Sequence, residues 1–158
     1  MAIHPKAQQR IALETSLARQ LSRGRVTHLG PQDVEHAWAY LPDLAQVFVR
    51  VAEQRAALPP HAVLHDAGLT LTGAQMHALI EAAQGRPMQG VGFPWWLMRL
   101  AAPFAAMPRA LIEMRYLWQR PHRLDERDLQ RLIGDVPHTP AAEVVRRCVA
   151  MLDDTARR

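Results

Sequence analysis

The amino-acid sequence predicts one helix-rich α/β domain with about six helices and three short strands. Its 158 residues lie within the usual range of roughly 100–200 residues for a single domain. Hydrophobic residues make up 49% of the chain and charged residues 22%, proportions typical of a folded globular protein. Short runs that favour strands alternate with longer runs of helical periodicity, a pattern typical of parallel strands joined by helices. Because so few strands make a narrow sheet, we expect the main sheet of the fold to lie elsewhere.

The first part of the chain predicts two helices with a strand between them. Apolar residues recur at helical spacing over residues 1–23, so we expect an N-terminal helix that ends near Gly24. Residues 25–29 (RVTHL) favour a strand, which a Gly-Pro turn closes. Apolar residues then recur at helical spacing over residues 42–57, and a pair of prolines ends this second helix.

The middle of the chain predicts two further strands on either side of a helix. Residues 61–66 (HAVLHD) favour the second strand, and residues 88–93 favour the third. Between them, Thr72 and Gln75 form a capping box, because each side chain can accept a hydrogen bond from the other residue's backbone N–H. We expect the helix that follows to run through Ala83 and to end at the glycine two residues later.

The last part of the chain predicts helices alone. Residues 93–121 hold three of the four tryptophans in a helical sequence that prolines interrupt. Asp125 can cap a short helix over residues 126–133. A Thr-Pro pair at 139–140 is typical of a helix start, and the final helix is expected to run through Leu152.

The reactive side chains exclude several kinds of chemistry. The one cysteine, Cys148, cannot form an intramolecular disulfide or a four-cysteine zinc site. The one lysine, Lys6, follows no glycine-rich loop, so there is no P-loop. Neither serine lies in the GxSxG motif of a hydrolase. Gly90 and Gly92 supply two glycines of a dinucleotide-binding fingerprint, but Trp95 occupies the third position.

The charge pattern and the histidines point to no nucleic-acid or metal partner. The net charge is +4, and the arginines are dispersed along the chain instead of forming a stripe. His61 and His65 would lie ~13 Å apart on a strand, too far apart to share an ion. We therefore expect no metal site. The start of the chain does not resemble a secretory signal and no apolar stretch could span a bilayer, so we expect a cytoplasmic protein.

Aromatic residues gather in the segment 93–121. They could line an apolar ligand pocket, or they could pack in the core: Trp95, Trp96, Phe104, Tyr116 and Trp118. Arginines beside tryptophans also suit a helix at a membrane interface. The prolines divide this segment into pieces too short for a long interfacial helix, so we do not expect membrane binding.

Three stretches read together resemble a known family. Residues 30–53 (with AWAYLPDLA), 61–87 (with AVLHDAG) and 93–125 (with FPWWLMRLAAPF) are similar to the C-terminal part of extended short-chain dehydrogenase/reductases, the NAD-dependent epimerase/dehydratase-like group. The resemblance covers residues 24–158. It implies the C-terminal portion of a Rossmann-type fold, in which the first stretch leads into a helix on the Rossmann sheet and the second supplies an edge strand.

The resemblance implies a substrate-binding role without catalytic residues. In the family the third stretch helps to roof the substrate pocket, so we expect Trp95, Trp96, Arg115 and Tyr116 to line or border an apolar cavity. The family's catalytic pair is a tyrosine with a lysine four residues on, but Leu44 follows Tyr40 and Arg120 follows Tyr116 at that spacing. The family's glycine-rich loop has no equivalent either. No catalytic or cofactor-binding residue is therefore assigned, and NAD(P) is implied only for the full-length family.

Two functions remain open on this basis. The chain could be the substrate-binding segment of an NAD(P)-dependent oxidoreductase or epimerase, inactive until a Rossmann half in another chain completes it. It could instead be a non-catalytic binding module with an apolar aromatic groove. In both cases we expect association with a partner or with itself, because a helix and a strand edge built to pack on a missing sheet would be exposed.

Overall fold

The computed structural model describes residues 20–156, which form six α-helices, two 3₁₀ helices and four short strands. The strands are β1 (Arg25–His28), β2 (Glu35–Trp38), β3 (Leu69–Thr72) and β4 (Gln89–Gly92). The helices are α2 (Leu41–Glu53), η1 (Arg55–Ala57), α3 (Gly73–Gln84), α4 (Trp95–Ala101), α5 (Ala106–Met114), η2 (Arg115–Trp118), α6 (Arg127–Ile133) and α7 (Ala141–Ala156). The predicted helix-rich α/β class is confirmed.

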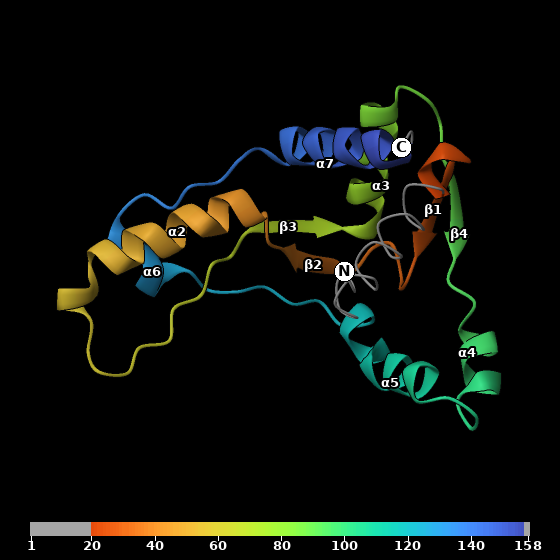
Figure 1. The fold of residues 1–158 in the computed structure, drawn as a ribbon, viewed down its shortest axis with the longest axis horizontal. Helices are drawn as coiled ribbons and strands as arrows, with labels where there is room; N and C mark the ends of the chain where they lie inside the picture. Colours follow the sequence, from red (N-terminus) through yellow and green to blue (C-terminus); the bar gives the residue numbers. More distant parts are fainter. Residues whose placement is uncertain (1–19, 157–158) are drawn as a thin grey trace, which may run out of the picture.

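The elements form an extended arrangement around two small strand pairs (Figure 1). Helix α7 packs along α3 at one edge, and α2 lies with α6 at one end of the molecule. The β1–β4 pair lies at the opposite end, and the hairpin of α4 and α5 lies below it. The β2–β3 pair runs through the middle and connects the two ends.

The strands pair differently from the prediction. Strands β1 and β4 are parallel, with Arg25 opposite Gln89, as expected for strands joined by crossovers. Strands β2 and β3 form a separate antiparallel pair, with Glu35 opposite Thr72. The described residues thus contain two two-stranded pairs in place of one three-stranded parallel sheet. Strand β2 was not predicted, because its four residues (EHAW) carry little strand propensity and depend on pairing with β3.

The predicted strand over residues 61–66 is wrong. These residues are neither helix nor strand, and none of the backbone hydrogen bonds of the described residues involves them. A β-favouring sequence becomes a strand only when a neighbour accepts and donates its backbone hydrogen bonds. No strand lies beside this segment in residues 20–156, so pairing begins further on, in β3.

Most of the predicted helices are confirmed. In α3, Thr72 Oγ1 accepts from the Gln75 N–H at 3.1 Å and Gln75 Oε1 accepts from the Thr72 N–H at 2.9 Å, which is the predicted capping box. Gly85 ends this helix with φ 64°, a left-handed conformation that favours glycine. The start of α6 differs from the prediction by one residue: Glu126 is the N-cap and forms no side-chain cap hydrogen bond, whereas Asp125, one residue earlier, accepts from the Arg127 N–H at 3.1 Å.

Pro94 precedes α4 and Pro103 lies between α4 and α5, as expected, but Pro108 lies in the first turn of α5 and no proline separates α5 from η2. The N-terminal helix predicted over residues 1–23 lies outside the described residues except for its end. Residues 20–22 are helical, and Gly24 follows with φ 70° and donates its N–H to the Leu21 carbonyl oxygen at 2.9 Å.

Apolar burial is divided between two small clusters. Val47, Leu129 and Val136 form one between α2 and α6, with Leu64 of the extended segment packed against it. The second group of buried apolar side chains lies around α7, α3 and β1: Leu21, Met88, Val144, Val145 and Val149. No helix within residues 20–156 is long and apolar enough to cross a membrane.

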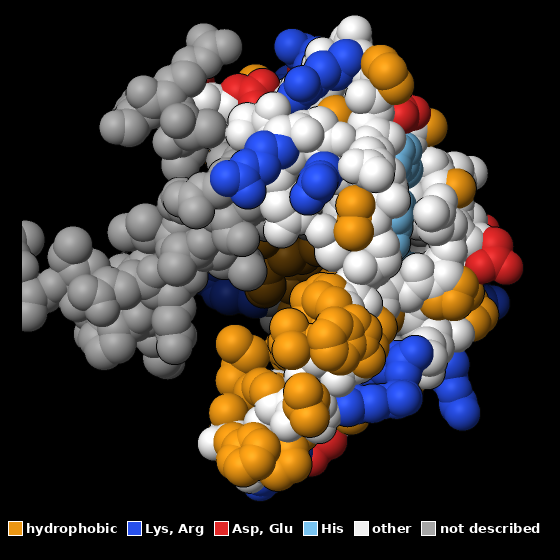
Figure 2. Space-filling model, turned by 90° about the vertical axis from the view of Figure 1, so that its right-hand side faces the viewer, with side chains coloured by type: hydrophobic (Ala, Val, Ile, Leu, Met, Phe, Trp, Pro, Cys, Tyr) orange, Lys and Arg blue, Asp and Glu red, His pale blue; other side chains and the backbone are white. Residues whose placement is uncertain are grey.

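Large apolar side chains are exposed on two surfaces. Hydrophobic side chains gather on the lower part of the face in Figure 2, over α4 and α5. This α4–α5 surface includes Trp96, Leu100, Phe104 and Met107, which are exposed to 65–90%. Helix α2 buries Val47, but Phe48 is 68% exposed on another side of the same helix.

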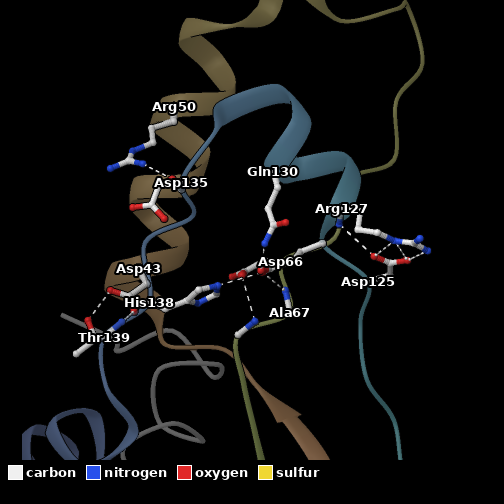
Figure 3. A network of polar contacts seen from close by, with 12 residues as sticks. Asp43, Arg50, Asp66, Ala67, Asp125, Arg127, Gln130, Asp135, His138 and Thr139 are labelled. Atoms are coloured by element: carbon white, nitrogen blue, oxygen red, sulfur yellow. Dashed lines mark hydrogen bonds and ion pairs between the residues drawn. The ribbon is translucent and has the colours of Figure 1, made fainter.

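A buried carboxylate joins the two ends of the molecule. Asp43, in the first turn of α2, accepts hydrogen bonds from the Thr139 N–H at 2.6 Å and from the Thr139 hydroxyl at 2.8 Å (Figure 3). Asp43 is 8% exposed and has no ion-pair partner among the described residues. The bonds therefore connect positions 96 residues apart and set where the chain enters α7.

We expect Asp43→Ala to lower the free energy of unfolding by about 2 kcal/mol, because the N–H and hydroxyl of Thr139 lose their charged acceptor. Asp43→Asn keeps one carbonyl oxygen and should cost less. The exposed Asp33→Asn is the matched control and should change stability by less than about 0.5 kcal/mol. Urea unfolding of the three variants measures this, and equal effects of Asp43→Ala and Asp33→Asn would contradict the role of the link.

Candidate functional site

The turn between β1 and β2 supports aromatic side chains on two sides. Trp95 Nε1, at the start of α4, donates a hydrogen bond to the Leu29 carbonyl oxygen at 3.0 Å. On the other side, the backbone of Trp118 lies so close to Gly30 that a Cβ at this position would overlap the Trp118 carbonyl oxygen. Glycine is therefore required at position 30 by the close approach of another backbone.

Two of the four predicted binding residues meet beside this turn. The Arg115 guanidinium lies 5.3 Å from the centroid of the Trp95 ring, in a cation–π contact. The ring of Phe93 meets the same tryptophan edge-on, with centroids 4.8 Å apart. Trp96 and Tyr116 do not join this contact: Trp96 is 69% exposed and Tyr116 is 57% exposed.

A small apolar pocket lies on the Trp118 side of the turn. Its volume is about 190 Å³, and its lining comes from β2, η2 and the segment after η2: His36, Ala37, Trp38, Leu117, Trp118 and His122. The Trp118 ring lies 6.4 Å from the Trp38 ring and 5.6 Å from the His36 ring, measured between centroids. The rings of His36, Trp38 and Trp118 therefore form an aromatic wall of the pocket that has few polar atoms.

The two histidines of the pocket have different environments. His36 is buried, and its ring nitrogens lie 3.1 Å from the Val34 carbonyl oxygen and 3.2 Å from the Leu117 carbonyl oxygen. Both partners are acceptors, and a neutral imidazole carries one N–H, so His36 donates to one of the two carbonyl oxygens while its other ring nitrogen also faces the backbone. His122 meets His36 edge-on at 5.1 Å, and its ring forms no hydrogen bond within the described part of the chain. His122 is therefore the polar group of the pocket that a ligand can engage.

Sequence reasoning placed Trp118 among the candidate pocket aromatics but missed His36, Trp38 and His122. His36 and Trp38 are two residues apart, the spacing that puts side chains on one face of a strand. This spacing predicts a shared face only if residues 35–38 are known to form a strand, which the sequence did not indicate.

A second histidine cluster ties β1 to α3. His28 Nε2 and His77 Nδ1 lie 3.0 Å apart, and His77 Nε2 lies 3.2 Å from the Met88 carbonyl oxygen. Because the carbonyl can only accept, the neutral His77 carries its proton on Nε2 and accepts from His28 through Nδ1. Burial, and then the charge of His77, lower the pKa of His28 below its ordinary value. Glu81 accepts from the Met88 N–H and lies 3.4 Å from His77, and the Met88 bond first and His77 second lower the pKa of Glu81.

No protein family model matches the chain, and no curated protein is significantly similar to it. Its fold is similar to the crystal structure of a "putative epimerase" from Burkholderia cenocepacia J2315, with a TM-score of 0.59 and 16% sequence identity. The similarity covers 91% of this chain and 40% of that chain, so the chain spans less than half the length of the epimerase structure. This likeness shows the fold: the chain has the architecture of part of an epimerase structure.

We expect Gly30→Ala to destabilise the protein by about 1–3 kcal/mol, because the added methyl group must displace the backbone of Trp118. Gly92→Ala is the matched control, since a Cβ there meets nothing within 4 Å and Gly92 has no positive φ. Thermal unfolding and tryptophan fluorescence measure the two effects. An unchanged emission spectrum with full stability in Gly30→Ala would show that the close approach is absent.

The His28 pair predicts a loss of stability in acid. Because folding lowers the pKa of His28, the unfolded chain takes up a proton at a higher pH than the folded chain, so stability falls as the pH drops below about 6.5. We expect His28→Gln to reduce this slope and His61→Gln, at an exposed histidine, to leave it unchanged. Urea unfolding between about pH 5 and 8 measures the slopes. Equal slopes for parent and His28→Gln would rule the pair out as the source.

Proposed function

We propose that this chain forms the substrate-binding part of an NAD(P)-dependent oxidoreductase or epimerase and is inactive without a dinucleotide-binding part. The observation that carries the proposal is the match of 91% of the chain to 40% of an epimerase structure. The resemblance of residues 30–53, 61–87 and 93–125 to the C-terminal part of the extended short-chain dehydrogenase/reductases supports the same assignment. The chain has neither the glycine-rich loop nor the tyrosine–lysine pair of that family, so NAD(P) would bind to the other part.

Helix α2 supports the need for a second body. Its buried side carries Asp43 and Val47, but Leu41, Phe48 and Val49 form a second apolar side that is 59–71% exposed. A helix that is apolar on both sides is typical of an element packed between two layers. One of those layers, α6, is present.

The extended segment 61–66 supports the same conclusion. Its backbone forms no hydrogen bonds within the described residues, and Leu64 packs inward while Val63 is 62% exposed. A strand from a partner could pair with this segment and cover the exposed side of α2. We therefore propose that the partner is the sheet-bearing dinucleotide-binding part, supplied by another chain.

The aromatic pocket is the proposed substrate contact. Trp38, Leu117 and Trp118 offer an apolar wall, and the His122 imidazole can donate or accept one hydrogen bond. Trp95 and Arg115 lie on the other side of the Leu29–Gly30 turn that supports this wall. With Trp96 and Tyr116 they remain the proposed border of the substrate pocket, which suits a small molecule with an apolar face.

A second function is favoured by one observation. The α4–α5 surface exposes Phe104 to 90% and Trp96 and Met107 to 69%, in a contiguous area on the lower part of the face in Figure 2. Surfaces of this kind are typical of protein association sites. The alternative is a non-catalytic module that binds itself or another protein through this surface.

A fusion protein tests the main proposal. The chain is joined to the part of the Burkholderia epimerase structure that the similarity does not cover, and unfolding is followed alongside NADH and NADPH fluorescence titrations. We expect the isolated chain to bind neither cofactor. We expect the fusion to unfold in one transition at a higher temperature than the isolated chain, because the missing sheet covers α2.

Phe48→Glu is the discriminating variant, since it places a charge on the exposed side of α2. It should lower the unfolding temperature of the fusion protein and leave that of the isolated chain unchanged. Phe104→Glu, on the α4–α5 surface, should leave both unfolding temperatures unchanged. Saturable NADH binding by the isolated chain would contradict the proposal. Dimerisation of the isolated chain that Phe104→Glu abolishes, with no stabilisation in the fusion protein, would favour the interaction module.

A further inference from the structure

Three potential metal ligands from separate parts of the chain converge at the start of α6. Asp66 ends the extended segment, Glu126 directly precedes α6, and His138 lies in the loop before α7. Each offers one donor atom, and these atoms all lie within 4.8 Å of one another. Figure 3 shows Asp66 and His138 approaching each other from two different irregular segments of the chain. Sequence analysis predicted no metal site, because the three residues are up to 72 positions apart and match no motif.

Within residues 20–156, the carboxylates of this cluster have no arginine partner. The arginines of α6 pair with other acids: Arg127 with Asp125 and Arg131 with Asp128. Arg127 Nε donates to both carboxylate oxygens of Asp125, at 3.0 and 2.9 Å, so this arginine is paired with the neighbouring carboxylate. Within the described residues, the basic group in ion-pair contact with Glu126 is His138, with Nε2 3.0 Å from Oε2. With His138 neutral, the cluster carries two negative charges, which a divalent cation would balance.

The surroundings hold the central ligand in place. Gln130 donates to Glu126 Oε1, and the Ala67 N–H donates to Oε2 at 3.4 Å. The Gly68 N–H donates to Asp66 Oδ1 at 3.2 Å, which leaves Oδ2 without a hydrogen bond in the described part of the chain. The Glu126 side chain is 17% exposed and His138 is 35% exposed, so an ion can reach the cluster from solvent. Hydrogen bonds of this kind orient metal ligands in proteins.

We propose that Asp66, Glu126 and His138 bind a divalent transition-metal ion of the zinc type. One imidazole nitrogen and two carboxylate oxygens suit zinc better than magnesium or calcium, which prefer oxygen ligands alone. In a tetrahedral zinc site, donors at ~2.0–2.2 Å from the ion lie roughly 3.3 Å apart. In the cluster, His138 Nε2 and Glu126 Oε2 lie 3.0 Å apart, and no two of the three donor atoms lie more than 4.8 Å apart. A water molecule would complete the coordination.

A bound metal ion would stabilise the position of the extended segment 61–66. Residues 61–66 form no backbone hydrogen bond to a strand within the described part of the chain, and Asp66 is the last residue of this stretch. An ion at the cluster would connect this segment both to α6 and to the entry of α7. Because binding requires the folded arrangement of all three ligands, it should raise the stability of the folded chain.

Cobalt and zinc titrations of metal-free protein test the proposal. Co²⁺ in a site with a histidine and two carboxylates gives visible absorption, and Zn²⁺ should displace it. We expect one Co²⁺ per chain in the parent, a higher thermal midpoint with Zn²⁺, and no such shift with Mg²⁺. His138→Gln and Asp66→Asn should each weaken Co²⁺ binding at least about tenfold.

The control variant is His61→Gln, which removes an exposed histidine outside the cluster. It should keep the Co²⁺ spectrum and the affinity of the parent. Far-UV circular dichroism of the metal-free variants shows that each is folded; if His138→Gln is not, the comparison rests on Asp66→Asn. A parent without Co²⁺ absorption, or equal affinities in parent and Asp66→Asn, would overturn the proposal. The cluster would then be an ion-pair network alone, whatever the outcome of the fusion experiment.

Discussion

The hydrogen bonds between Asp43 and Thr139 hold together two ends of the molecule that share no common core. One apolar cluster lies between α2 and α6, and the other lies around α7 and α3. A buried carboxylate is costly unless it is fully hydrogen-bonded, and the Thr139 N–H and hydroxyl supply that compensation. Because both groups belong to Thr139, two residues before α7, the link directs α7 away from α6 and along α3. The strand pair β2–β3 makes the second connection, and both depend on backbone groups more than on apolar burial.

The buried apolar clusters are small because each strand pair has only two short strands. Two strand pairs cannot cover the apolar sides of six helices, so α2 is apolar on both its buried and its exposed side. The extended segment 61–66 has the composition of a strand, and no strand of residues 20–156 lies beside it. The similarity to 40% of an epimerase structure agrees with this account, since the chain has the architecture of part of a larger fold.

The candidate site depends on the same connections. The Leu29–Gly30 turn leads from the β1–β4 pair into the β2–β3 pair, and both Trp95 and Trp118 contact it. Strand β2 then presents His36 and Trp38 to Trp118 on one face. Both ring nitrogens of His36 contact backbone carbonyl oxygens, so this side chain positions the wall of the pocket. The ring nitrogens of His122 form no hydrogen bond within the described residues and are available to a ligand. The chemistry of the pocket is therefore that of an apolar wall with one imidazole.

The sequence by itself determined the helices and their ends, because those signals are local. The Thr72–Gln75 capping box and the left-handed Gly85 each act within one turn of α3. Local pattern also identified the two parallel strands, β1 and β4, and the proline breaks in the tryptophan-rich segment. The tertiary structure alone decided which β-favouring residues became strands, since β2 formed against β3 and residues 61–66 found no neighbour. It also decided the polar clusters, because Asp66, Glu126 and His138, or His36 and His122, meet only when distant segments pack. Helix signals are carried by neighbours in sequence, whereas strand pairing and binding sites are made by neighbours in space.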